Sequence, residues 1–204
     1  MSELRDGRRR RRRRADAERN IAAILDAAVH VLNARPEASI EDIAEAAGVT
    51  RPTVYAHFPS REALLNAAVN HVTEQALAAM DAADLDHGPP AAALMRFMEA
   101  GWQTFERYPL LLGASAQQTD PQAEHDRHQP VQERLERLIR RGQQAGDFDP
   151  SLSPTWLTTI SIGLGHTAGE QVTAKNMTSD EAWTALQHTI LRIFGVDNAR
   201  RAGR

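Results

Sequence analysis

Apolar residues recur at helical spacing along most of the chain, and this periodicity constrains the fold more than any other feature. From Asp16 to about Ala34 they stand three, four and seven positions apart, which is typical of an amphipathic helix. Similar segments follow, separated by stretches containing Pro, Gly, Asn and Asp that are typical of turns. The sequence shows no alternating strand pattern of useful length and no internal repeat. It therefore predicts an all-α fold of about nine helices.

Capping residues and prolines predict where the helices begin. Ser39 and Thr50 are placed to cap two short helices, and Ser60 to cap a longer one that extends through Met80. After the turn-like segment 84–90, further helices are predicted at 90–107, 109–118, 130–145, 154–173 and 178–194. Most of these begin with Pro, which is tolerated in the first turn because the N–H that it lacks has no partner there. The predicted organisation is a disordered Arg-rich arm (1–14), a three-helix head (15–62), a larger helical domain (63–196) and a flexible basic tail (197–204).

Composition excludes several classes of function. The 204-residue chain has no cysteine, which rules out disulfides, thiolate zinc sites and cysteine nucleophiles. It has no run of about 18 apolar residues and no secretory signal, so we expect a cytoplasmic protein without membrane association. Gly-rich phosphate loops, metalloprotease helix motifs and nucleophile elbows are also missing from the sequence. We therefore expect neither an enzyme nor a cofactor.

The stretch SIEDIAEAAGVTRPTVYAHF, residues 39–58, has the pattern of a helix-turn-helix. Two short helices are joined by AGV, in which Gly48 suits the left-handed turn that ends the first helix. Near and within the second helix, Val49, Val54 and Phe58 are spaced to face the core. The outward side chains include donors that suit phosphate oxygens and base edges in a major groove. These outward residues are Arg51, Pro52, Thr53, Tyr55, Ala56 and His57.

The longer run SIEDIAEAAGVTRPTVYAHFPSREALLNAAV resembles the N-terminal signature of the TetR family of transcriptional regulators, and the likeness extends over residues 21–70. The resemblance implies a homodimer that places one recognition helix of each subunit in the major groove of a palindromic, double-stranded DNA operator. It implies phosphate contacts by Ser39, Tyr55, His57 and Arg61. It also implies that Thr50 opens the recognition helix and that Arg51, Pro52, Thr53 and Ala56 face base edges. Arg51 is the expected guanine reader, because a bidentate guanidinium contact discriminates by about 1–3 kcal/mol. Ala56 is smaller than its counterpart in many members of the family, so we expect a van der Waals contact there.

Aromatic and methionine side chains gather between residues 94 and 108, and they suit either a plain core or the wall of an apolar ligand cavity. The family resemblance favours the cavity, because the C-terminal helices of the family enclose an inducer site. The effector is expected to be an apolar small molecule, and its identity is open. The candidate ligand-binding residues are Phe97, Trp102, Phe105, Trp156 and His166.

The last two predicted helices are candidates for a dimer interface. Small residues such as Gly163 and Ala168 allow close helix approach, which a two-fold bundle of four helices uses. The family resemblance places the dimer there, and the alternative is that these helices only close the core of the monomer. The candidate interface residues are Ile160, Leu164, Thr167, Ala168, Trp183, Leu186, Ile190 and Phe194.

Two polar clusters have spacings that metal sites also use. The segment EHDRH (124–128) has two histidines three positions apart, and His166 stands four positions before Glu170. Neither cluster supplies a third and a fourth convincing ligand, so we expect no metal. The first is interpreted as solvated loop surface, and the second as a polar anchor for a ligand or an interface pair.

Charge is distributed unevenly along the chain. Residues 1–14 contain eight arginines against Glu3 and Asp6, a local charge of +6, which leaves −9 for the rest of a chain whose total is −3. The head from residue 15 to residue 60 has three arginines against seven acids, a charge of −4. We therefore expect the arginine run to contact the DNA backbone or minor groove. The alternatives are a solvated tail and a nuclear or uptake signal. The run comprises Arg8, Arg9, Arg10, Arg11, Arg12, Arg13 and Arg14.

Taken together, these features predict a sequence-specific DNA-binding transcriptional regulator. The family resemblance favours a repressor that a small-molecule effector releases from its operator. The alternative is a small-molecule binding or sequestering protein whose head does not read DNA.

Overall fold

The computed structural model describes the backbone of residues 2–116 and 121–196, and their side chains except those of 2–13, 15, 114–116, 121 and 123–125. The secondary structure of this part of the chain is entirely helical, which confirms the predicted all-α fold. None of the described helices is long and apolar enough to cross a membrane. The predicted basic tail, 197–204, lies outside the described residues. The helices are α1 (Ser2–Ala34), α2 (Ile40–Ala46), α3 (Arg51–His57), α4 (Arg61–Ala82), α5 (Pro90–Arg107), α6 (Pro109–Ala116), α7 (Pro121–Gln144), α8 (Pro154–Thr173) and α9 (Ser179–Ile193).

The chain divides into two compact units, and the division falls inside α4. The N-terminal unit comprises Met1–His71 and Leu110–Ser115, and the C-terminal unit comprises Val72–Pro109 and Ala116–Arg204. This division comes later than residue 62, the predicted end of the head. Because buried apolar residues recur along α4 from Leu64 to Met80, one continuous helix supplies side chains to both units.

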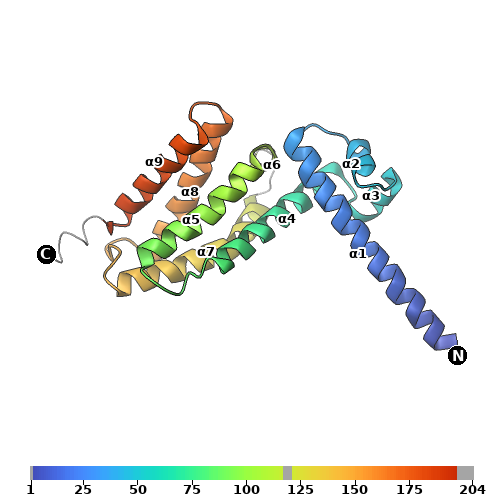
Figure 1. The fold of residues 1–204 in the computed structure, drawn as a ribbon, viewed down its shortest axis with the longest axis horizontal. Helices are drawn as coiled ribbons and strands as arrows, with labels where there is room; N and C mark the ends of the chain where they lie inside the picture. The colour runs from blue at the N-terminus through green and yellow to red at the C-terminus, as the bar shows by residue number, and fades with distance from the viewer. Residues whose placement is uncertain (1, 117–120, 197–204) are drawn as a thin grey trace. The chain divides into compact units, whose positions relative to one another are not determined.

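The N-terminal unit contains α1, α2 and α3 (Figure 1), and each of these helices buries apolar side chains. Ile24, Ala28 and Leu32 follow one another at intervals of one helical turn along α1, and all three are buried. Ile43 of α2 and Val54 of α3 are fully buried as well. Burying an aliphatic side chain of this size contributes about 1.5–3 kcal/mol. The two short helices are therefore held by their packing against neighbouring helices rather than by their own length.

The start of α6 belongs to the same unit and is held by Asn33 near the end of α1. The Oδ1 atom of Asn33 accepts hydrogen bonds from the backbone N–H groups of Leu110 at 3.2 Å and Leu111 at 3.3 Å. These are two of the N–H groups that a helix leaves without partners in its first turn. Asn33 therefore acts as an N-cap supplied from another helix.

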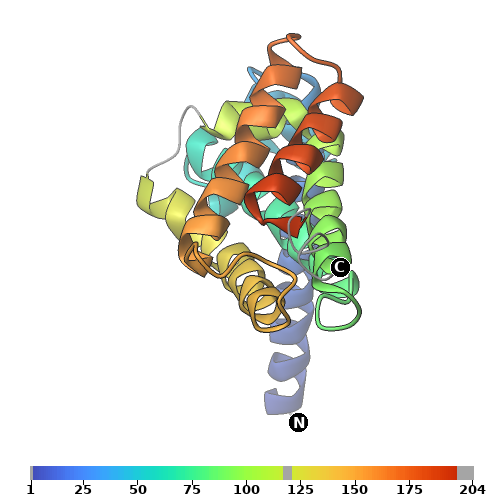
Figure 2. The same cartoon turned by 90° about the vertical axis from the view of Figure 1, so that its left-hand side faces the viewer.

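The arginine run lies in the first turns of α1, which begins at Ser2 and extends well beyond α2 and α3 (Figures 1 and 2). The sequence predicted a disordered arm over residues 1–14, and the helical backbone of residues 2–14 differs from that prediction. Arginine is a good helix former, and lengthening an existing helix avoids the cost of nucleation. The side chain of Arg14 is exposed, and its Nε lies 3.1 Å from Oε1 of Glu18.

In the C-terminal unit, α5, α7, α8 and α9 pack around one apolar core, and α8 and α9 lie side by side (Figures 1 and 2). Phe148 and Phe194 meet edge to face inside this core, with ring centroids 5.0 Å apart. Gly142 of α7 lies directly against the Phe148 ring. Thr178 and Glu181 form the predicted capping box at the start of α9.

α7 begins at Pro121, whereas the sequence predicted a helix that starts at Pro130. Pro130 lies inside α7, where its missing N–H leaves one carbonyl without the usual helical partner. Both prolines suit a first helical turn, and the segment between them has no apolar stripe that would favour one start. The segment 124–128, predicted as a loop, is consequently part of a helix.

Candidate nucleic-acid interface

Two N-caps and one glycine determine the local geometry of the helix-turn-helix. The Ser39 hydroxyl accepts from the backbone N–H of Asp42 at 3.2 Å, and the Asp42 carboxylate accepts from the backbone N–H of Ser39 at 2.8 Å. Thr50 caps α3 by accepting from the backbone N–H of Thr53. Gly48, in the turn between the helices, has a φ of 67°, a conformation that favours glycine. The start of α3 is therefore fixed by its neighbours.

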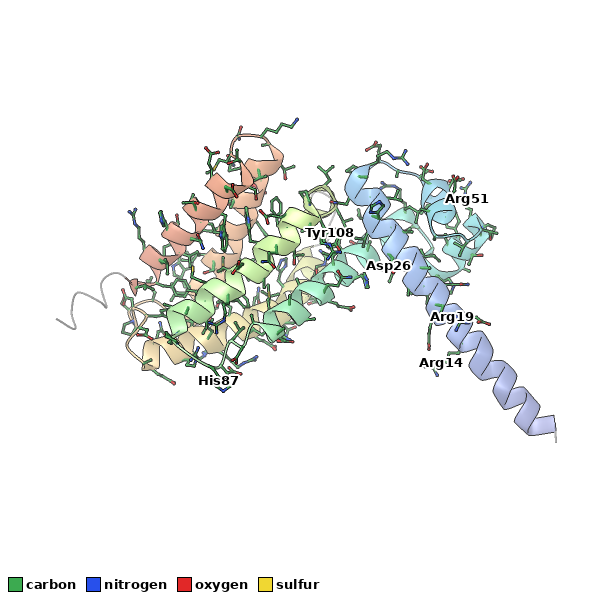
Figure 3. All side chains as sticks on the ribbon, viewed as in Figure 1. Arg14, Arg19, Asp26, Arg51, His87 and Tyr108 are labelled. Carbon is green, nitrogen blue, oxygen red and sulfur yellow. The ribbon has the colours of Figure 1, made fainter. Side chains whose placement is uncertain are left out.

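α3 exposes most of the side chains that the sequence assigned to DNA. Tyr55 is 39% exposed and is one of three exposed large hydrophobic side chains among the described residues, and Arg51 lies on the α2–α3 side of its unit (Figure 3). The opposite side of α3 is buried through Val54. A short helix with an open face of this kind fits the width of a major groove. The exposed residues are Arg51, Pro52, Tyr55 and Ala56, and the half-buried ones are Thr53 and His57.

Arg51 is held between Glu41 of α2 and Tyr55 of α3. Its Nη1 donates to Oε1 of Glu41, and its Nη2 lies 3.5 Å from the Tyr55 hydroxyl. The guanidinium carbon also lies 5.4 Å from the centroid of the Tyr55 ring, within cation–π range. The Tyr55 hydroxyl and the Glu41 carboxylate hold the pKa of Arg51 above its ordinary value. No sequence pattern marked Glu41 as a contact of Arg51. The four-residue spacing of Arg51 and Tyr55 was visible in the sequence, but the contact with Glu41 depends on how α2 and α3 cross.

Ser39 and Arg61, two predicted phosphate contacts, both bind other groups of the protein. The Ser39 hydroxyl lies 2.7 Å from the Asp42 carboxylate, and with the Ser39 N–H and the nearby Arg35 it holds the pKa of Asp42 below its ordinary value. The half-buried guanidinium of Arg61 donates to the backbone carbonyl of Ala38 at 3.2 Å and to that of Pro36. These contacts stabilise the connection between α1 and α2. Contacts of the two residues with phosphate stay predictions.

Each arginine of the head between residues 15 and 60 has an acidic partner. All three ion pairs are exposed to solvent, which screens them, so they contribute little to stability. They nevertheless lower the positive potential that the head presents to a polyanion. The pairs are Arg19 with Asp16, Arg35 with Asp42, and Arg51 with Glu41.

Three of the candidate ligand residues lie inside the C-terminal unit. Trp102 is buried, its ring stacks on Trp183 of α9 at a centroid distance of 5.8 Å, and Phe105 lies 5.2 Å from it. Phe105 in turn covers Gly169 of α8. The indole Nε1 of Trp102 has no hydrogen-bond partner among the described residues. Phe97 is buried in the same apolar core.

Trp156 and His166 lie at the surface of the single chain. Trp156 is 55% exposed in the first turn of α8, so it lines no interior wall of its own subunit, and its assignment as a ligand residue stays a prediction. His166 is exposed, and its ring meets that of His128 from α7 edge to face at 5.1 Å. The described residues contain no group of three or more side chains that could hold a metal ion.

The candidate dimer residues divide into a buried set and a surface set. Leu186 and Ile190 of α9 and Phe194 at its C-cap are buried in the core of their own chain, and their predicted part in a dimer interface stays a prediction. The apolar periodicity of α9 does not reveal which neighbour covers its apolar face. The remaining candidates are only partly covered or exposed in the single chain; they are Ile160, Leu164, Thr167, Ala168 and Trp183.

Comparisons with known proteins agree with this geometry. The sequence profile described as bacterial regulatory proteins, tetR family, matches residues 24–68, which contain α2 and α3. The HTH-type transcriptional repressor LfrR of Mycolicibacterium smegmatis is 48% identical over 83 residues, or 41% of this chain and 44% of LfrR. The regulator EthR of the same species is 33% identical over 53% of this chain and 51% of EthR. The chain thus spans about half the length of these two relatives, 44% and 51%.

Two further comparisons extend beyond the helix-turn-helix. The HTH-type transcriptional regulator NfxB of Pseudomonas aeruginosa is 30% identical over 148 residues, which cover 72% of this chain and 77% of NfxB. The crystal structure of the TetR-like regulator LfrR in complex with proflavine aligns with 86% of this chain and 96% of its own, with a TM-score of 0.66 and 28% identity. On these grounds the chain belongs to the TetR family of bacterial regulatory proteins.

Proposed function

We propose that this protein is a sequence-specific DNA-binding transcriptional regulator that acts as a homodimer in the bacterial cytoplasm. The observation that carries the proposal is the exposed face of α3, which presents Arg51 and Tyr55 on a short helix capped by Thr50. That face lies within the segment that the family profile matches. Arg51 at the start of α3 supplies a guanine contact, while the small or flat side chains of Pro52 and Ala56 let the helix approach base edges closely.

The proposed dimer contact lies on the outer side of α8. Trp156, Ile160, Gly163 and Thr167 are spaced four, three and four residues apart, so they share one side of the helix. A tryptophan that is 55% exposed leaves a large apolar area in water, and a second copy of α8 would cover it. A two-fold dimer then presents two α3 helices, which is why we propose a palindromic operator.

The proposed effector site lies at the aromatic cluster of Trp102, Phe105 and Trp183. LfrR, the relative described above, was crystallised with proflavine, a planar aromatic compound. A planar ligand suits stacking on these rings, and a ligand acceptor atom would satisfy the buried Nε1 of Trp102. Ligand binding is proposed to favour a dimer state with lower operator affinity, which makes the protein a repressor that its effector releases.

Selection of bound sequences from a random duplex pool tests the DNA-reading proposal. We expect an enriched palindrome, and we expect Arg51→Ala to lose preference at one base pair of each half-site. Discrimination at that pair should fall by about 1–3 kcal/mol. If the selection enriches no sequence at moderate salt, the proposal is contradicted.

A second candidate function is a small-molecule binding protein whose head does not read DNA. The acidic head, in which all three arginines between residues 15 and 60 are paired with acids, favours this alternative. Replacing Tyr55 and His57 together by Ala separates the two functions. A DNA reader loses its regulatory effect in cells, whereas a sequestering protein keeps both its effect and its ligand affinity.

A further inference from the structure

The contact between Glu41 and Arg51 joins the two helices of the reading head. Glu41 is in the first turn of α2, Arg51 is the first residue of α3, and both side chains are about half exposed. We infer that Glu41 is a positioning residue for DNA recognition, which orients the Arg51 guanidinium together with Tyr55 and thereby increases sequence discrimination. This inference rests on the proposed function of α3.

The geometry leaves Arg51 able to bind a base while Glu41 holds it. A guanidinium has five N–H groups, and the two contacts use one on Nη1 and one on Nη2. Three N–H groups are left over, including at least one on each Nη atom, and a bidentate contact with guanine needs two. Glu41 and Tyr55 can therefore orient the guanidinium group while its other three N–H groups stay available for a base.

The position of Glu41 is itself well determined. The capping box of Ser39 and Asp42 fixes the start of α2, two residues before and one residue after Glu41. Thr50, which caps α3, fixes the backbone directly before Arg51. Because arginine has many rotamers, restraining its guanidinium before binding reduces the entropy lost when it docks on a base.

A carboxylate at this place has opposite effects on affinity and on specificity. Its negative charge repels phosphates, so it weakens binding to every duplex. Its contact with Arg51 favours one orientation of the guanidinium, so it improves discrimination at the base pair that Arg51 reads. A residue that only added charge would show the first effect without the second.

The experiment compares Glu41→Gln with Glu45→Gln in the full-length protein. Glu45 lies one turn further along the same side of α2, is exposed, and makes no side-chain contact with Arg51 in the described structure. Affinities are measured for the selected palindrome, for the palindrome changed at the base pair under Arg51, and for random duplex. Both variants should bind random duplex about twofold to threefold more tightly, since each loses one negative charge. Only Glu41→Gln should lower the ratio between palindrome and changed palindrome, by about fivefold.

The outcomes distinguish failure of the positioning role of Glu41 from failure of the proposed base reading by Arg51. An equal ratio in wild type and Glu41→Gln, or an equal loss in both variants, overturns the positioning role. If Arg51→Ala also leaves the ratio unchanged, the proposed reading by Arg51 fails instead. The double variant Glu41→Gln with Arg51→Ala should match Arg51→Ala in its ratio, because Glu41 acts through Arg51. Equal melting temperatures of the single variants establish that folding is unaffected.

Discussion

Neutralising the arginine run should reduce DNA affinity without changing sequence preference. The perturbation is replacement of Arg8 to Arg14 by Gln in the full-length chain. The head that these residues precede has a charge of −4 between residues 15 and 60, and its three arginines are paired with acids. Attraction to phosphate must therefore come largely from outside that segment.

The helical backbone of α1 sets the expected size of the effect. A helix turns once every 3.6 residues, so about three or four of seven consecutive positions can face one DNA strand. Each phosphate contact contributes about 0.9 to the slope of log affinity against log salt, which gives a loss of about 3 in the slope. A doubling of salt should then cost the wild type about eightfold more affinity than the Gln variant. An extended arm contacting through all seven positions would give a slope change of about 6.

Fluorescence anisotropy titrations of random duplex at several salt concentrations measure this slope directly. Replacement of the same seven residues by Lys is the matched control, because it keeps the charges and should keep the slope. An unchanged slope in the Gln variant would refute the role of the run in binding. A slope change near 6 would refute a helical geometry of the run and favour an extended arm.

Three further predictions concern stability. In Gly142→Ala the new Cβ would lie 2.1 Å from Cδ2 of the buried Phe148 ring. We therefore expect the free energy of unfolding, measured by thermal unfolding, to fall by about 1–3 kcal/mol. Gly165→Ala, where the new Cβ would meet nothing within 4 Å apart from its chain neighbours and the adjacent backbone of its own helix, should instead stabilise α8 by up to about 1 kcal/mol; equal effects at the two sites would contradict the role of the Phe148 clash. Asn33→Ala should cost about 1 kcal/mol through loss of the cap on α6, whereas Asn33→Asp keeps an acceptor and should restore most of it. The Nε atom of Arg134 lies 2.6 Å from Oδ1 of Asp81 and holds the pKa of that carboxyl group below its ordinary value. This pair therefore stabilises the fold above about pH 4, and the stabilisation is lost as the pH falls through the pKa of Asp81 in the folded state. Asp81→Asn should therefore flatten the acid side of the stability profile by at most about 1 kcal/mol, and an unchanged profile would exclude the contribution of the pair.

The sequence predicted helices best where a proline or an N-cap marks the start. The bounds 90–107 and 154–173 agree with α5 and α8, because Pro90 and Pro154 stand at the only position in a helix that suits them well. The same reasoning placed the start of α7 at Pro130. The local sequence around a proline inside a helix does not differ from that around a proline that begins one, so the true start at Pro121 was missed. The start of α1 was missed for a different reason. A run of like charges is typical of disorder, yet arginine is also a good helix former when a helix already continues from it.

Residue roles were predictable only where one element decides them. The exposure of Arg51 and the burial of Val54 follow from the periodicity of α3 alone. The role of Arg61 depends on the carbonyls of Pro36 and Ala38, which are distant in sequence, and no local pattern announces that contact. The burial of Ile190 depends likewise on which helix packs against α9. Tertiary pairing therefore decided the assignments that sequence patterns left open.

The proposed binding mode separates affinity from discrimination along this chain. Arg51 has its charge balanced by Glu41, so its docking on a base adds little net attraction to a polyanion. The arginine run has an excess of charge but contacts no defined base edge in the proposed binding mode, so it strengthens binding to all duplexes equally. Salt should then weaken binding to operator and to random duplex by nearly the same factor, and their ratio should change little between low and moderate salt. A ratio that falls steeply with salt would show that operator binding involves more phosphate contacts than non-specific binding, which would place part of the discrimination in the arginine run rather than in α3.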